Sequence, residues 1–94
     1  MISEYVNYLI SLGTDNIPHR ESNLLAHSIG VSEMLSSYDR PLEEQVAGLF
    51  HSIYGTEFQM YKIIVTREEV QSIIGERSEY IANLFCTLED RVHT

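Results

Sequence analysis

The sequence predicts an all-α fold, a compact orthogonal bundle of about five helices, on the basis of three observations. Apolar residues recur at the three- and four-residue spacing of helices along almost the whole chain. Alternating apolar and polar runs, which would indicate half-buried strands, are not seen in the sequence. Glycines, prolines and other turn formers interrupt the helical pattern at short intervals. The 94 residues are enough for one domain, which we expect to span residues 1–94.

The first helix is expected over residues 2–12, where the apolar residues form one stripe. Gly13 follows at a position typical of a helix C-cap. The segment 14–20 contains Asp15, Asn16 and Pro18, which favour turns, and is predicted to be a loop that reverses the chain.

A second helix is predicted over residues 21–38, and Ser22 or Asn23 could instead cap a later start. Gly30 lies in the middle of this helix, where glycine costs about 1 kcal/mol relative to alanine. We therefore expect another helix or a ligand to approach closely at Gly30.

The third helix is expected from about residue 42 to residue 54, because Pro41 suits a first helical position and Gly55 an exit. Gly48 is a second small residue, on the apolar face of this helix. Residues 56–65 have mixed periodicity and are predicted to form a loop or a short irregular piece.

The remaining helices are predicted over residues 66–74 and 78–88. Thr66 and Glu69 have the spacing of a capping box, in which each side chain covers a free backbone amide of the other residue. Gly75 separates the two helices, and residues 91–94 are expected to fray.

Charge and composition exclude several classes of protein. Fourteen acidic and six basic residues give a formal net charge of −8, which disfavours nucleic acid and anionic membranes as partners. A nucleotide-like substrate would need a bound cation to offset this charge. The single cysteine, Cys86, excludes an internal disulfide, and the N-terminus lacks the basic start of a signal peptide, so a cytoplasmic location is expected. No apolar run is long enough to cross a bilayer.

Two histidines carry the strongest chemical signal. His27 and His51 each lie on or beside the apolar face of an interior helix, at comparable distances from the turn at residues 39–41. If the two helices pack antiparallel, the imidazoles meet. A converging pair suits a divalent ion such as iron, manganese or zinc. Equally, each ring could be a core histidine whose nitrogens bond to backbone carbonyls.

The sequences around these histidines resemble the HD superfamily of metal-dependent hydrolases. LLAHSIGVSEML contains His27, and AGLFHSIYGT is similar to the HD pattern of a helix with Ala-x-Leu-x-His-Asp. More narrowly, AGLFHSIYGTE, the upstream His19 and the late Leu-Glu-Asp-Arg run look like an HD-like family with no established reaction. The resemblance implies an HD-like helical fold with one or two divalent cations that activate water to attack phosphate esters, or, in a minority of members, di-iron oxygenase chemistry.

The resemblance also implies a ligand set. His27 matches the first ligand, His51 the dyad histidine and Asp90 the final aspartate, whereas Ser52 stands in place of the dyad aspartate. Because a hydroxyl bridges two cations poorly, we expect at most one ion. Its candidate ligands are His19, His27 and His51 through nitrogen and Glu57 or Asp90 through oxygen.

Tyr54 and Arg91 are candidate substrate contacts. Tyr54 lies one turn beyond His51, and Arg91 carries a guanidinium that matches carboxylate or phosphate. Core packing for Tyr54 and a solvated helix end for Glu79, Asp90 and Arg91 remain open. Cys86 is expected to be a small buried residue, and no serine lies in a Gly-x-Ser-x-Gly motif that would indicate a serine hydrolase.

Two classes of function follow from these residues. The first is a metal-binding domain that hydrolyses a small phosphorylated or otherwise anionic substrate, and an iron-dependent oxygenase is a variant of it. The second is a catalytically inactive helical module that binds another protein or a second copy of itself. Such a module would use the apolar strip formed by Phe58, Met60, Tyr61, Ile63 and Ile64.

Overall fold

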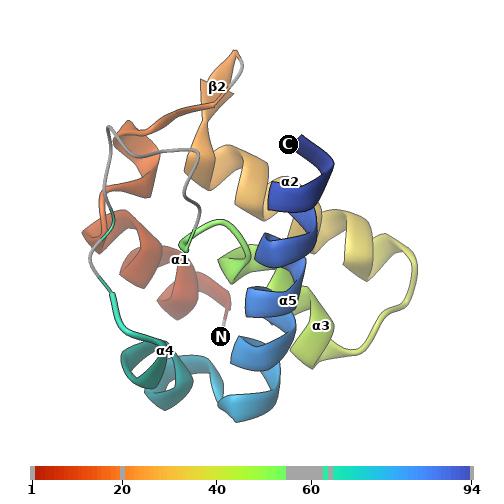
Figure 1. Ribbon diagram of the computed structural model, residues 1–94. Coiled ribbons are helices and arrows are strands. Elements are labelled where there is room, and N and C mark those ends of the chain that lie inside the picture. The colour runs from red at the N-terminus through yellow and green to blue at the C-terminus, as the bar shows by residue number, and fades with distance from the viewer. Residues whose placement is uncertain (1, 20, 55–62, 64, 94) are drawn as a thin grey trace.

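A computed structural model describes residues 2–19, 21–54, 63 and 65–93, without the side chains of residues 2, 19 and 88–93. The predicted loop at 56–65 and most of the predicted apolar strip therefore lie outside the described residues. The described part confirms the all-α prediction (Figure 1). Its elements in chain order are α1 (Ile2–Ser11), the 3₁₀ turn η1 (Thr14–Asn16), β1 (Pro18–His19), β2 (Ser22–Asn23), α2 (Leu24–Ser37), α3 (Leu42–Phe50), α4 (Arg67–Ile74) and α5 (Glu76–His93).

The helices pack into a compact body around α3, which lies against both α2 and α5. The radius of gyration is 12.2 Å, close to the value of about 12.4 Å expected for a compact chain of this length. In Figure 1, α4 lies at the lower end of the view, where it packs against α5. Of the helices that the structure describes, none has both the length and the apolar character needed to cross a bilayer.

The segment between α1 and α2 is more regular than the predicted loop. It contains η1 and a two-residue antiparallel pairing in which Pro18 faces Asn23 and His19 faces Ser22. The helix α2 begins at Leu24 and not at residue 21, because Asn23 is extended and its side chain accepts a 2.8 Å hydrogen bond from the amide of Ala26. The later start that the sequence allowed is the one observed.

Two other helix limits also differ from the prediction. α3 ends at Phe50, and residues 51–54 form a tight turn in which the amide of Ile53 donates to the carbonyl of Phe50. α5 begins at Glu76 and continues to His93, so it is longer at both ends than the helix predicted over residues 78–88. His51 thus follows the last residue of α3 directly.

The predicted capping box forms only in part. Thr66 accepts a 3.1 Å hydrogen bond from the amide of Glu69, as predicted. The Glu69 carboxylate instead accepts a hydrogen bond from the hydroxyl of Tyr8 on α1. Burial first, and then this bond, raise the pKa of Tyr8 to about 12. Glu69 therefore connects α4 to α1 rather than closing its own helix start.

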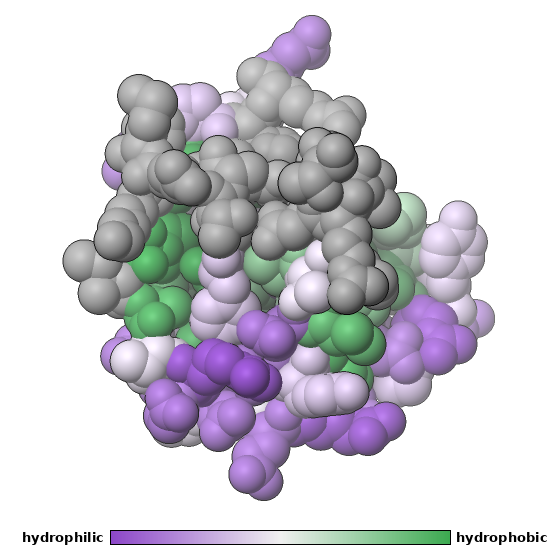
Figure 2. Space-filling view, in the orientation of Figure 1, coloured by the Kyte–Doolittle hydropathy of each residue, from purple (hydrophilic) through white to green (hydrophobic). Residues whose placement is uncertain are grey.

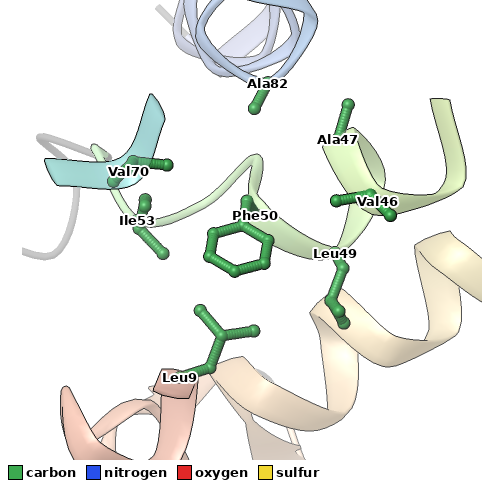
Figure 3. Close-up of a cluster of buried hydrophobic side chains, with 8 residues drawn as sticks. All are labelled: Leu9, Val46, Ala47, Leu49, Phe50, Ile53, Val70 and Ala82. Carbon is green, nitrogen blue, oxygen red and sulfur yellow. The ribbon is translucent and has the colours of Figure 1, made fainter. Parts of the chain in front are cut away.

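The hydrophobic core is centred on Phe50, whose side chain is fully buried (Figure 3). Its ring contacts Tyr5 edge-on, with centroids 5.8 Å apart, and stacks on Tyr8 at 6.1 Å. The other members of this core come from α1, α3, the turn after α3, α4 and α5: Leu9, Val46, Ala47, Leu49, Ile53, Val70 and Ala82. The core therefore fixes both sides of His51, through Phe50 before it and Ile53 after it.

The two helical glycines have opposite environments. A Cβ at Gly48 would lie 2.7 Å from Leu35 Cδ1 and 3.1 Å from Val31 Cγ1 on α2, so a side chain there would collide with the neighbouring helix. A Cβ at Gly30 would meet no described atom within 4 Å, other than the backbone of its own helix and its chain neighbours, and Gly30 is exposed. The close approach expected at Gly30 is therefore wrong, and α2 and α3 approach at Gly48.

Alanine substitutions should separate these two positions. Gly48→Ala is expected to lower the free energy of unfolding by about 1–2 kcal/mol, because Leu35 can rotate away but the β-branched Val31 cannot. Gly30→Ala should raise it by up to about 1 kcal/mol, through helix propensity alone. Urea unfolding monitored by circular dichroism measures both changes. Equal effects of the two substitutions would contradict the packing described at Gly48.

Candidate functional site

His51 is held in one orientation by the end of α3. His51 is 3% exposed, and its Nδ1 lies 2.6 Å from the carbonyl oxygen of Gly48. A carbonyl oxygen can only accept, so Nδ1 carries a proton and donates it to Gly48. In the neutral ring, Nε2 is then the nitrogen that carries the lone pair. A backbone carbonyl that fixes the tautomer in this way is the usual partner of a metal-binding histidine.

His27 reaches His51 from α2. The two histidines meet, as the sequence predicts, with Nε2 of His27 3.3 Å from Nε2 of His51. His27 is only half-buried, so one side of the pair is nearer to solvent. The meeting depends on the close packing of α2 on α3, which Gly48 permits one turn before His51.

The geometry of the pair suits a shared ion. Two nitrogens that each lie about 2.0–2.1 Å from one tetrahedral ion are about 3.3 Å apart. The ring centroids are 5.1 Å apart. Two imidazoles that both point at one tetrahedral ion have centroids about 5.2 Å apart. Two imidazoles joined by a linear N–H···N bond of this length have centroids about 5.6 Å apart. The planes are tilted by 57°. The rings thus converge at an angle instead of facing each other end to end.

Ser52 adds a third polar atom at the same point. Its residue is 4% exposed, and its Oγ lies 3.0 Å from Nε2 of His51. With Nδ1 of His51 protonated, the Ser52 hydroxyl can donate to Nε2 when that nitrogen holds no other partner. Two imidazoles and one hydroxyl therefore converge at this point.

The described residues contain two of the predicted ligands with their side chains, His27 and His51. His19 lies in β1 and Asp90 in α5, but their side chains, and all of Glu57, are outside the described residues. Within the described part of the chain, no group of three or more histidine, cysteine, aspartate or glutamate side chains could hold a metal ion. His19, Glu57 and Asp90 therefore stay predicted ligands.

Tyr54 is directed to a carboxylate on another helix. Its hydroxyl donates a 3.0 Å hydrogen bond to Oε2 of Glu79 on α5. Burial first, and then this bond, raise the pKa of Tyr54 well above its usual value. The Tyr54 hydroxyl therefore anchors the turn that carries His51 and Ser52. Arg91, the other predicted substrate contact, lies in α5 with its side chain outside the described residues.

Glu79 is a buried carboxylate, although its sequence position also allowed a solvated helix end. It is 0% exposed and accepts hydrogen bonds from Arg67 Nε at 2.8 Å, Arg67 Nη2 at 3.0 Å, Gln71 Nε2 at 3.0 Å and Tyr54. These bonds, led by those of Arg67, hold the pKa of Glu79 below its usual value. One signal was available, because Glu79 shares a helical face with the buried Ala82 and Cys86.

Hydrophilic side chains cover the outside of α4 and the start of α5. Figure 2 shows them gathered at the lower part of the face. Glu68, Glu69 and Glu76 are in the first turns of these helices, where the helix dipole favours negative charge. Cys86, as predicted, is buried.

Comparison with known proteins assigns a family without an activity. A family model described as "Domain of unknown function (DUF6817)" matches residues 8–91. The matched span contains every site residue predicted from the sequence. No curated protein and no solved structure gives a significant match. None of these comparisons links the chain to the HD superfamily, so that resemblance stays a prediction.

Proposed function

The chain belongs to the DUF6817 family, and we propose that it binds one divalent metal ion, iron, manganese or zinc, through His27 and His51. The proposed reaction is hydrolysis of a small phosphorylated or otherwise anionic substrate. The observation that carries the metal proposal is the convergence of the two Nε2 atoms at 3.3 Å, with the tautomer of His51 fixed by Gly48. The reaction class rests on the resemblance to HD hydrolases.

The residues present fit a single ion. When bound, the ion would supply Lewis-acid activation of a water and of a substrate oxygen. His51 would keep its ligating nitrogen in place through its bond to Gly48, and Tyr54 would hold the turn against Glu79. Ser52 provides a neutral hydroxyl next to the ligands, which favours one ion over two.

Charge supports the need for a cation. The chain has a formal net charge of −8, which repels phosphorylated substrates at a distance. His27 and His51 are neutral ligands, so they add no negative charge to the ion. An ion held by them attracts an anion more strongly than one held by carboxylates alone.

The second candidate is a catalytically inactive binding module. It is favoured by the contacts of the pair itself, because Gly48, Ser52 and the partner imidazole satisfy the nitrogens of His51 without an ion. On this account the two histidines join α2 to α3 and contribute only to stability. The two candidate functions make different predictions. Only the first requires metal binding and substrate hydrolysis to depend on His27 and His51.

A hydrolysis assay tests the reaction. Protein stripped with a chelator should not hydrolyse a panel of phosphomonoesters and phosphodiesters, and adding Mn²⁺, Fe²⁺ or Zn²⁺ should restore turnover. His27→Ala should lower that turnover by at least about a hundredfold, because it removes a ligand. Arg77→Met, which changes an exposed ion pair with Glu43, is the control and should keep full activity.

Two outcomes of the assay would contradict the proposal in different ways. Turnover that persists in the chelated protein would show that the reaction needs no metal. Protein that binds metal but hydrolyses no ester would remove the hydrolase reaction and leave the metal site. With iron bound, an oxygen-consumption assay then tests the oxygenase variant.

A further inference from the structure

A small pocket lies away from the two histidines. Helices α1, α2 and α3 enclose a pocket of about 230 Å³. Its lining consists of Val6, Ile29, Ser32, Glu33, Ser36, Gln45 and Leu49. This volume is below that of a site for drug-sized ligands and suits a molecule of about ten non-hydrogen atoms.

The pocket and the histidine pair use different faces of the same helix. The α2 residues of the pocket, at positions 29, 32, 33 and 36, form one stripe with the spacing of a helical face. At about 100° per residue, this stripe lies roughly opposite to His27. A ligand in the pocket would therefore not contact the histidine pair through this helix.

Ser32 is a buried polar residue in the pocket lining, and it indicates that the pocket binds a ligand. Ser32 is 5% exposed, yet no hydrogen bond joins its hydroxyl to any residue that the structure describes. Ser37 on the same helix behaves differently, because its hydroxyl donates at 2.7 Å to the carbonyl of Met34. A buried hydroxyl without a protein partner is uncommon and requires a water or a ligand to satisfy it.

The lining selects the charge of the ligand. Val6, Ile29 and Leu49 provide an apolar surface, and Ser32 and Ser36 provide hydroxyls. Gln45 uses its Nε2 to donate at 2.8 Å to the carbonyl of Arg40, which leaves its amide oxygen as an acceptor. Glu33 adds a carboxylate. None of the described residues that line the pocket is basic, so the site offers acceptors and negative charge to its occupant.

We propose that this pocket binds a small primary amine, a protonated ammonium on a short aromatic or branched apolar body. The body packs on Val6, Ile29 and Leu49. The ammonium donates to the carboxylate of Glu33 and to neighbouring hydroxyl or amide oxygens. The overall charge of −8 favours the approach of such a cation and disfavours carboxylate analogues of the same shape.

Binding is tested with three probes of matched shape: 2-phenylethylamine, 2-phenylethanol and phenylacetate. Chemical-shift changes are followed on the ¹⁵N-labelled, metal-free chain of 94 residues. The amine should saturate with a dissociation constant of about 1 mM and shift the amides of Ile29, Ser32 and Leu49. The alcohol should bind about tenfold more weakly, and the carboxylate should cause no saturable shift.

Matched variants test the role of the carboxylate. Glu33→Gln should remove the preference for the amine over the alcohol, and it affects an exposed residue that the fold does not need. Glu76→Gln makes the same change in net charge at the exposed start of α5 and should leave the preference intact.

The proposal is overturned if the amine gives no saturable shift up to about 20 mM, or if all three probes bind alike. It is also overturned if Glu33→Gln and Glu76→Gln have the same effect, because the preference would then reflect net charge alone. Since the protein is free of metal and both histidines are retained, these results do not depend on the metal site.

Discussion

Arg67→Met is expected to lower the free energy of unfolding at neutral pH by more than the loss of an exposed ion pair does. The carboxylate of Glu79 is 0% exposed, and Arg67 is the group that neutralises it through two hydrogen bonds of 2.8 and 3.0 Å. Without the guanidinium, a buried negative charge retains only Gln71 and Tyr54. The expected cost is below that of breaking a fully buried pair, because the Arg67 side chain itself is 49% exposed and solvent screens its charge.

The pH dependence gives this prediction a second readout. Arg67 first, then Gln71 and Tyr54, lower the pKa of Glu79 in the folded state. The stability from the ionised carboxylate is therefore fully present above the unfolded pKa of about 4.3, and it is lost as the pH falls through the lower folded value. Protonated Glu79 has no charge to neutralise. The difference between the parent and Arg67→Met should thus become smaller below about pH 4.

Arg77→Met is the matched control for this experiment. Arg77 pairs with Glu43 at the same distance of 2.8 Å, but the two side chains are 73% and 43% exposed. An exposed pair of this kind contributes about 0–1 kcal/mol. Urea unfolding of the three proteins at several pH values measures the effects. If Arg67→Met and Arg77→Met lower the free energy of unfolding equally, the hydrogen bonds of Arg67 to the buried Glu79 do not stabilise the fold more than an exposed ion pair does.

The helices and the meeting of the histidines were predictable because each depends on local spacing. Apolar residues at helical intervals defined the helices, and the short turn between α2 and α3 placed His27 and His51 at similar distances from it. The tautomer of His51 was not predictable. It depends on the carbonyl of Gly48, which becomes a partner only because α3 ends at Phe50 and the chain turns there.

Features that depend on several distant segments were missed. Glu79 has the composition of an exposed helix residue, and only the arrival of Arg67, Gln71 and Tyr54 from other elements allows its burial. Gly30 and Gly48 are both glycines inside helices, and the sequence does not show which one faces a neighbour. Helix ends were misplaced where tertiary contacts, such as those of Ile53 and Tyr54, replaced the helical continuation.

Loss of one histidine should abolish stable metal binding. Because each imidazole supplies one of the two described donors, His27→Ala and His51→Ala should each raise the dissociation constant for metal by more than about a hundredfold, beyond the effect of removing an outer partner. His27 is only half-buried, so His27→Ala is expected to fold even if the buried His51 also contributes to stability. Circular dichroism checks the fold of each variant. His93→Ala, which removes a histidine with no proposed role, is the control.

The metal content of protein purified without a histidine tag, measured by elemental analysis, tests the central claim most directly. The account predicts close to one equivalent of iron, manganese or zinc in the parent and in His93→Ala, and none in folded His27→Ala or His51→Ala. A parent protein that contains no metal and takes up none on titration would contradict it. So would metal that stays bound when either histidine is removed, and in both cases the pair would be a structural contact between α2 and the end of α3.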